Sequence, residues 1–266
     1  MKYIWLTDTH FNFLSEPDLV SFYLKLEAEK ADGIFLTGDV STGPHLTKHL
    51  LWLEKVVRTP IYFVLGNHDY YRSSFTEVEN KMTKIMQSNE NIRYLSVSEP
   101  ISLTKDVALV GHDGWYDARW RDPITPFIFI WDWYFVKDFR ALFGIKERLD
   151  LVRERALLAA EFIEKSLQKA FESHSTVYML THFPPWPEVS NKYYGLIEKF
   201  WMPYNSSKIM SDYIERVMVS RPDKNLVILA GHTHIKRTLE ISPNIKIIVG
   251  DAEFGKPQIQ DILIIK

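Results

Sequence analysis

The feature that most constrains this chain is a set of short, nearly continuous apolar runs, each followed at once by polar residues. The five clearest runs cover residues 3–7, 33–37, 61–65, 177–180 and 226–230. Such runs are typical of strands that are buried on both faces of a mostly parallel sheet. Stretches with helical spacing lie between several of them, from about residue 17 and over 46–57, 75–86 and 145–171. This alternation predicts an α/β layered fold.

The residues that follow these runs carry oxygen and nitrogen donors. In chain order they are Asp8-Thr9-His10, Gly38-Asp39, Gly66-Asn67-His68-Asp69, Thr181-His182 and Gly231-His232-Thr233-His234. Ligands of open α/β sheets bind outside the carboxyl ends of the strands, so we expect the five segments to meet at one rim. Two carboxylates and several neutral imidazoles can hold two divalent cations if an anionic oxygen bridges them, and Asp39 is the candidate bridge.

The joint occurrence of these motifs carries the inference, because each motif alone is weak. A single Asp-x-His pair is common, and Gly-Asp after a strand is ordinary turn chemistry. His232-x-His234 alone could be two surface histidines, and His182 alone could be a structural histidine. Five such segments, each at the end of an expected strand, favour a metal site.

Composition limits the chemistry and the partners of the chain. The sequence has no cysteine, so a metal would be bound by His, Asp, Glu or Asn. The formal net charge of -2 provides no basic field for a nucleic-acid backbone. No apolar stretch approaches the roughly 18 residues of a membrane span. We therefore expect a cytoplasmic protein with no membrane association.

A single domain over residues 1–266 is expected, because neither a linker nor a repeat divides the chain. The C-terminal segments 238–241, 245–249 and 259–265 are predicted to form antiparallel strands. An aromatic-rich insertion at about 114–145, which includes Phe127, shows little periodicity. One interpretation is an irregular packed insertion. The other is a cap or a partner-binding surface beside the site, and a partner-binding surface would make a homodimer worth testing.

Taken together, the motifs resemble the five signature blocks of the calcineurin-like metallophosphoesterase superfamily. The blocks are Asp8-x-His10, Gly38-Asp39, Gly66-Asn67-His68-Asp69, His182 and Gly231-His232-x-His234. The resemblance implies a four-layer αββα sandwich of two mixed β-sheets flanked by helices. It also implies two metals, Mn, Fe or Zn, with one bound by Asp8, His10, Asp39 and His234 and the other by Asp39, Asn67, His182 and His232.

The activity that the resemblance implies is hydrolysis of a phosphodiester or phosphomonoester by a hydroxide that bridges the metals. His68 is the candidate general acid for the leaving oxygen. Asp69 has two interpretations of equal weight: it orients or charge-stabilises His68, or it caps the helix that follows Tyr70. Arg119 and Arg121 could receive a phosphate, although surface or Asp-paired roles are the favoured interpretation.

Within the superfamily, the chain resembles the small bacterial-type phosphohydrolases, which implies a small phosphorylated substrate. Thr42 stands three residues after Asp39, where purple acid phosphatases carry a tyrosine ligand. Two alternatives stay open. One is a Mn-dependent nuclease of the same superfamily, against which the net charge argues. The other is a catalytically weak, metal-stabilised interaction scaffold, against which the presence of His68 argues.

Overall fold

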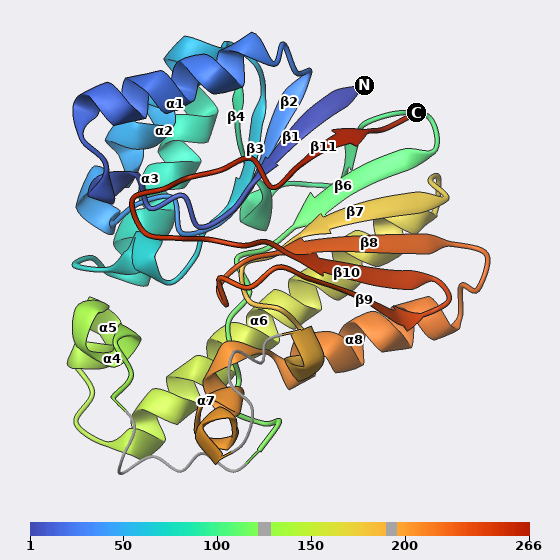
Figure 1. Ribbon diagram of the computed structural model, residues 1–266. Coiled ribbons are helices and arrows are strands. Elements are labelled where there is room, and N and C mark those ends of the chain that lie inside the picture. The colour runs from blue at the N-terminus through green and yellow to red at the C-terminus, as the bar shows by residue number, and fades with distance from the viewer. Residues whose placement is uncertain (122–128, 190–195) are drawn as a thin grey trace.

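Two mixed β-sheets that pack face to face form the centre of the molecule (Figure 1). The structure is a computed structural model that describes residues 1–121, 129–189 and 196–266. Helices cover the outer faces of the sheets. The predicted α/β sandwich of two mixed sheets flanked by helices is therefore confirmed.

The first sheet has the strand order β11-β1-β2-β3-β4. Its strands are β1 (Lys2–Leu6), β2 (Gly33–Thr37), β3 (Ile61–Val64), β4 (Ile92–Tyr94) and β11 (Asp261–Ile264). Strands β1 to β4 are parallel, with a helix in each crossover, whereas β11 pairs antiparallel with β1. The carboxyl ends of β1, β2 and β3 consequently lie at the same edge of the sheet.

The second sheet has the strand order β5-β6-β7-β8-β10-β9. Its strands are β5 (Ile101–Ser102), β6 (Val107–Gly111), β7 (Thr176–Leu180), β8 (Asn225–Ala230), β9 (Arg237–Ser242) and β10 (Ile245–Val249). The prediction of antiparallel C-terminal strands is correct for β9 with β10 and for β11 with β1 of the first sheet, whereas the parallel pairing of β10 with β8 was not predicted. Turn residues indicate a hairpin, but they do not indicate which sheet edge receives it.

Alternate side chains of the strands enter two different cores. Trp5 of β1 and Phe35 of β2 pack between the sheets with Leu109 of β6 and Leu180 of β7. Ile4, the neighbour of Trp5, belongs instead to the core that includes helix residues. Successive side chains of a strand point to opposite faces, so each of these strands must be apolar on both faces. This requirement explains the continuous apolar runs of the sequence.

The helices form the outer layers of the sandwich. α1 (Glu16–Ala28), α2 (Gly43–Val57) and α3 (Phe75–Ser88) cover the first sheet, and α6 (Ile145–Phe171) packs with α8 (Lys208–Val219) on the second (Figure 1). α3 begins with a capping box, in which Ser74 and Glu77 bond reciprocally to backbone N–H groups. None of the helices in the described part of the chain is long and apolar enough to cross a membrane.

The aromatic-rich region contributes to both the core and the surface. It contains the short helices α4 (Asp132–Phe135) and α5 (Lys137–Arg140), and the ring of Trp133 in α4 contacts Tyr204 of α7 (Leu196–Asn205). Trp115 is buried, whereas the side chains of Trp131 and Phe143 are 56% and 103% exposed. Phe127 lies outside the described residues. Buried and exposed aromatic residues therefore occur in the same segment.

Candidate metal centre

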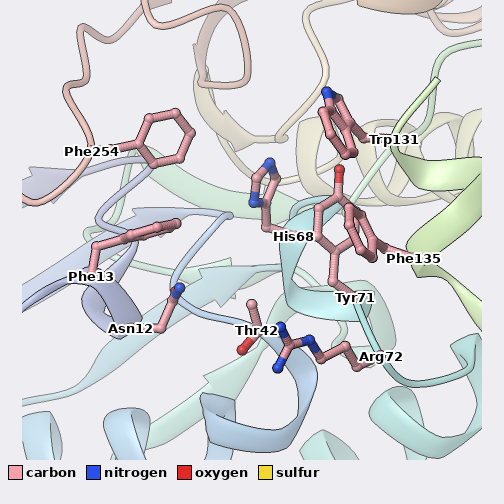
Figure 2. A pocket seen from close by; sticks show the side chains of 9 residues that line it. All are labelled: Asn12, Phe13, Thr42, His68, Tyr71, Arg72, Trp131, Phe135 and Phe254. Atoms are coloured by element: carbon pink, nitrogen blue, oxygen red, sulfur yellow. The ribbon is translucent and has the colours of Figure 1, made fainter. Parts of the chain in front are cut away.

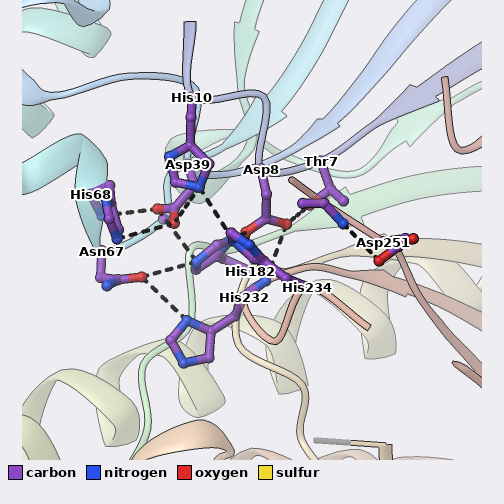
Figure 3. Close-up of polar contacts among 12 residues, drawn as sticks. Thr7, Asp8, His10, Asp39, Asn67, His68, His182, His232, His234 and Asp251 are labelled. Carbon is purple, nitrogen blue, oxygen red and sulfur yellow. Dashed lines mark hydrogen bonds and ion pairs between the residues drawn. The ribbon is translucent and has the colours of Figure 1, made fainter. Parts of the chain in front are cut away.

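Loops at the carboxyl ends of five strands bring the predicted site residues together (Figure 3). Asp8 and His10 follow β1, Asp39 follows β2, Asn67 and His68 follow β3, His182 follows β7, and His232 and His234 follow β8. Residues 224 positions apart in the chain come into contact here. Every candidate ligand that the sequence indicated lies in this cluster.

Four side chains form a first group that could hold a metal ion. Asp8, His10, Asp39 and His234 each offer one ligand atom, and in the described structure these atoms all lie within 4.8 Å of one another. Nε2 of His234 is 3.2 Å from Oδ1 of Asp8 and 3.3 Å from Nε2 of His10. Two carboxylates and two imidazoles are a donor set that suits Mn, Fe or Zn.

A second group shares Asp39 with the first. Oδ1 of Asn67 is 3.1 Å from Nε2 of His182 and 3.3 Å from Nδ1 of His232. Nε2 of His182 is 3.4 Å from Oδ1 of Asp39, whereas Nε2 of His10 is 3.7 Å from Oδ2 of the same carboxylate. Asp39 therefore presents one oxygen to each group (Figure 3).

Burial keeps several of these histidines neutral, which is the form that binds a metal. It lowers the pKa of His10 to about 2, and it also lowers the pKa of His182 and of His232. Nδ1 of His182 donates a hydrogen bond to the carbonyl oxygen of Thr37 at 2.9 Å. Its lone pair is therefore on Nε2, the atom that faces Asp39 and Asn67.

Burial acts in the opposite sense on the carboxyl groups. It raises the pKa of Asp39, and the charge of neighbouring Asp8 raises it further. Burial also raises the pKa of Asp8, but the hydrogen bond with His234 and the other histidines around the carboxylate outweigh it, so the net pKa is below the usual value. A divalent cation between the carboxylates would supply the positive charge that neutral histidines do not. The residues of the cluster thus fit a metal centre.

Five of the candidate ligands have a left-handed backbone. The φ angle is 47° at Asp8, 42° at His10, 51° at Asp39, 73° at His232 and 56° at His234. Residues with a Cβ rarely adopt this conformation, and where they do the surrounding structure must enforce it. Stability of the fold does not favour five such residues in one place, so their clustering supports a functional site.

Gly66 is required by a close approach within the cluster. A Cβ at this position would overlap Oδ1 of Asp39 and would lie 2.7 Å from Cε1 of His182. We expect Gly66→Ala to displace Asp39, to reduce metal binding and to lower the free energy of unfolding by about 1–3 kcal/mol. Thermal denaturation with a parallel measurement of bound metal checks this. An unchanged melting temperature and metal content would show that the loop accommodates the Cβ without a loss of stability, which would contradict this prediction.

His68 is the accessible histidine beside the shared carboxylate. Its side chain is 24% exposed, and Nε2 lies 3.9 Å from Oδ2 of Asp39. The His68 ring stacks on Tyr71 with the ring centroids 4.3 Å apart. Burial lowers the pKa of His68 to about 3. A substrate that approached the cluster could therefore reach His68.

Asp69 joins two loops of the site. Its buried carboxylate accepts hydrogen bonds from the backbone N–H of Ser41 at 2.8 Å and of Gly66 at 2.9 Å. The loops after β2 and β3, which carry Asp39 and Asn67, are tied together in this way. The interpretation of Asp69 as the cap of the following helix is wrong, because Ser74 occupies the N-cap of α3.

Asp132 is a residue of the site that sequence reasoning missed. Its buried Oδ1 accepts hydrogen bonds from Nδ2 of Asn67 and from the hydroxyl of Tyr71, both at 2.8 Å. The bond to Asn67 turns the amide oxygen toward His182 and His232. Asp132 belongs to the aromatic-rich region, 65 residues from Asn67, so no local motif could indicate it. An acidic residue within an aromatic stretch was the available signal.

A pocket of about 740 Å³ lies beside His68 (Figure 2). Its lining is largely aromatic and consists of Phe13, Tyr71, Trp131, Phe135 and Phe254 together with Asn12, Thr42, His68 and Arg72. Arg72 is the basic residue of this lining, whereas Arg119 and Arg121 do not line it. Arg72 follows the Gly66–Asp69 motif without belonging to it, so no motif indicated it.

The fold and the cluster define an α/β protein with a buried Asp–His group suited to divalent metals. The sequence pattern of the family described as calcineurin-like phosphoesterase matches residues 1–236. This chain belongs to the calcineurin-like phosphoesterase family, as the resemblance of its five motifs predicts. No curated protein matches the sequence.

Solved structures support the same fold. Phosphopantetheinyl hydrolase from Mycobacterium tuberculosis superimposes with a TM-score of 0.65 at 14% identity, covering 96% of this chain and 90% of that chain. A dimetal phosphatase from Danio rerio has a TM-score of 0.60 at 12% identity, covering 97% of this chain and 89% of that chain. At these identities the likeness concerns the fold.

Proposed function

We propose that the protein hydrolyses a phosphodiester or phosphomonoester with two divalent ions held around Asp39. The position of Asp39 carries the proposal, because its two carboxylate oxygens approach different groups of side chains. Closely spaced dications need such a shared anionic ligand. Asp8, His10 and His234 would complete the first group, and Asn67, His182 and His232 the second.

The bound ions, His68 and Asp69 would have different roles in such a reaction. The bound ions would supply Lewis-acid stabilisation of the phosphoryl oxygens and a water of lowered pKa. His68 would donate a proton to the leaving oxygen from Nε2, the ring nitrogen that lies 3.9 Å from Asp39. Asp69 would act as a positioning residue, because it holds the two loops together through backbone N–H groups.

Hydrolysis of bis-p-nitrophenyl phosphate and of p-nitrophenyl phosphate tests the proposal. The protein is assayed after addition of Mn, Fe or Zn, and its metal content is measured. We expect turnover of at least one ester that a chelator abolishes and metal restores. Two bound metals without turnover of either ester would favour the scaffold alternative. Cleavage of DNA much faster than either ester would favour the nuclease.

Removal of Asp132 is expected to weaken one of the two metal sites. In Asp132→Ala, the Asn67 amide loses the acceptor that orients it, and affinity for the second ion should fall by about 10–100-fold. Asp132→Asn keeps an acceptor oxygen and should retain more of the affinity. Calorimetric metal titration measures both variants beside Asp150→Ala, a control on the exposed surface of α6. Equal affinities in wild type and Asp132→Ala would contradict this role.

A further inference from the structure

The pocket beside His68 has two aromatic walls (Figure 2). Phe13 and Phe254 form one wall, with their ring centroids 5.1 Å apart in an edge-to-face arrangement. Tyr71, Trp131 and Phe135 form the other wall. In it the rings of Trp131 and Phe135 are nearly parallel, at 5° and a centroid distance of 5.4 Å. His68 lies between the walls, so the apolar space begins at the proposed proton donor.

Three of the six strongly exposed aromatic residues in the described part of the chain line this pocket. Phe13 is 57%, Trp131 56% and Phe254 49% exposed. These three residues come from η1 (Phe11–Phe13), from the aromatic-rich region and from the segment before β11, respectively. Three distant segments thus present rings to one space of about 740 Å³. Apolar surface that gathers in this way at a site marks a place where a ligand binds.

The rings also restrict the shape of that ligand. A flat ring can stack on an aromatic ring of the lining, and its edge can meet Phe13 or Phe254. Offset-stacked and edge-to-face contacts of this kind are the favoured geometries of aromatic pairs. A saturated group of the same size would bury a similar apolar area without these contacts. The lining therefore favours a planar aromatic ligand over an aliphatic one.

We propose that this pocket binds a planar aromatic group carried by the leaving alcohol of the phosphoester substrate. The inference rests on the proposed hydrolysis. In that reaction the bond between phosphorus and the leaving oxygen breaks, a bond from water oxygen to phosphorus forms, and His68 donates the proton that the leaving oxygen takes up. The leaving oxygen must then lie at His68. Since the His68 ring stacks on Tyr71 of the second wall, the remainder of the alcohol extends into the pocket.

A pair of substrates matched in size tests the proposal. Benzyl phosphate and cyclohexylmethyl phosphate differ in the ring, while both release a primary alcohol, so chemical reactivity differs little. Each is assayed as the monoester and as the methyl diester, with metal-loaded protein and detection of the released alcohol. We expect kcat/KM to be about tenfold higher for the benzyl compound, the effect of one or two aromatic contacts.

Variants of the pocket lining test whether the preference for the benzyl compound arises in the pocket. Each replaces an aromatic ring by an apolar side chain without a ring. In Trp131→Leu and Phe254→Leu the benzyl preference, measured as the ratio of kcat/KM for the two compounds, should fall several-fold toward unity. Phe143→Leu is the matched control, because Phe143 is fully exposed in the same region and does not line the pocket. Its preference should equal that of the wild type.

Two kinds of result would overturn the inference: one contradicts the aromatic subsite alone, and the other contradicts the proposed hydrolysis as well. Equal kcat/KM for the two compounds, or a preference that the variants leave unchanged, would remove the aromatic subsite but leave the phosphoesterase proposal standing. The second result concerns benzylphosphonate and cyclohexylmethylphosphonate, which cannot be hydrolysed at the carbon–phosphorus bond and whose binding is measured by calorimetry. Preferential binding of benzylphosphonate without turnover of any ester would overturn the proposed function and, with it, the assignment to a leaving alcohol.

Discussion

Replacement of His68 by alanine should lower kcat by about 10²–10⁴-fold, which is the usual contribution of a positioned acid or base. The content of bound metal should stay unchanged, because His68 lies outside both groups of candidate ligands. Initial rates and metal analysis on the same preparation measure the two quantities together. His45→Ala provides the control, since His45 is an exposed histidine on α2. Loss of metal in His68→Ala would contradict the expectation.

The leaving group determines how large the His68 effect is. Burial lowers the pKa of His68 to about 3, so its ring is neutral at neutral pH when no substrate is bound. The negative charge of a bound phosphoester would raise this pKa and so favour the protonated ring. A p-nitrophenolate leaves without protonation, whereas an alkoxide does not. The decrease in kcat should therefore be much larger for an alkyl phosphate than for a p-nitrophenyl ester. Equal decreases would assign His68 to stabilisation of charge rather than to proton donation.

Asp39→Asn should remove both metal binding and turnover. The amide is neutral, and its nitrogen cannot serve as a ligand, so the two groups would lose their shared anion. Wild-type protein should gain about 2.7 kcal/mol of stability from a ligand present at 100 times its dissociation constant. The variant should gain much less. Thermal denaturation with and without added metal measures the difference, and rates should fall to background.

Without metal, the same substitution should leave the protein at least as stable as the wild type. The pKa of Asp39 is raised in the folded state, chiefly by burial, so ionisation destabilises the fold as the pH rises through that pKa. The neutral amide of the Asp39→Asn variant does not ionise, so this cost is absent at pH 8. The control is Asp223→Asn in the exposed turn before β8, which should behave like wild type in both conditions. A metal-free variant that melts well below metal-free wild type would contradict this account.

Local sequence patterns were sufficient to predict most elements of the fold. Runs such as 33–37 and 61–65 are apolar on both faces because β2 and β3 lie between a second sheet and a layer of helices. The parallel pairing of β10 with β8 was not predictable, since it depends on which sheet edge is next to β10 in the folded protein. Register and partner choice arise from the assembled sheet and not from the strand's own residues.

The candidate ligands were predictable for a related reason. Each stands within a few residues of a strand end, and parallel strands place their carboxyl ends at one edge. Asp69 was harder to interpret. Its sequence position beside His68 suggested a direct role, whereas its carboxylate bonds to the backbone of Ser41 and Gly66. A neighbour in sequence need not be a neighbour of the side chain.

The sequence by itself determined the α/β class, the order of the strands along the chain and the set of donors that could bind metal, because strand periodicity and the residues at strand ends are local properties. Tertiary structure alone decided which oxygen of Asp39 faces which group, that Asp132 orients Asn67, and that Phe13, Trp131 and Phe254 surround one pocket. These relations join residues far apart in the chain. Their physical origin is the packing of the two sheets and the aromatic-rich region against one another, which no local pattern encodes.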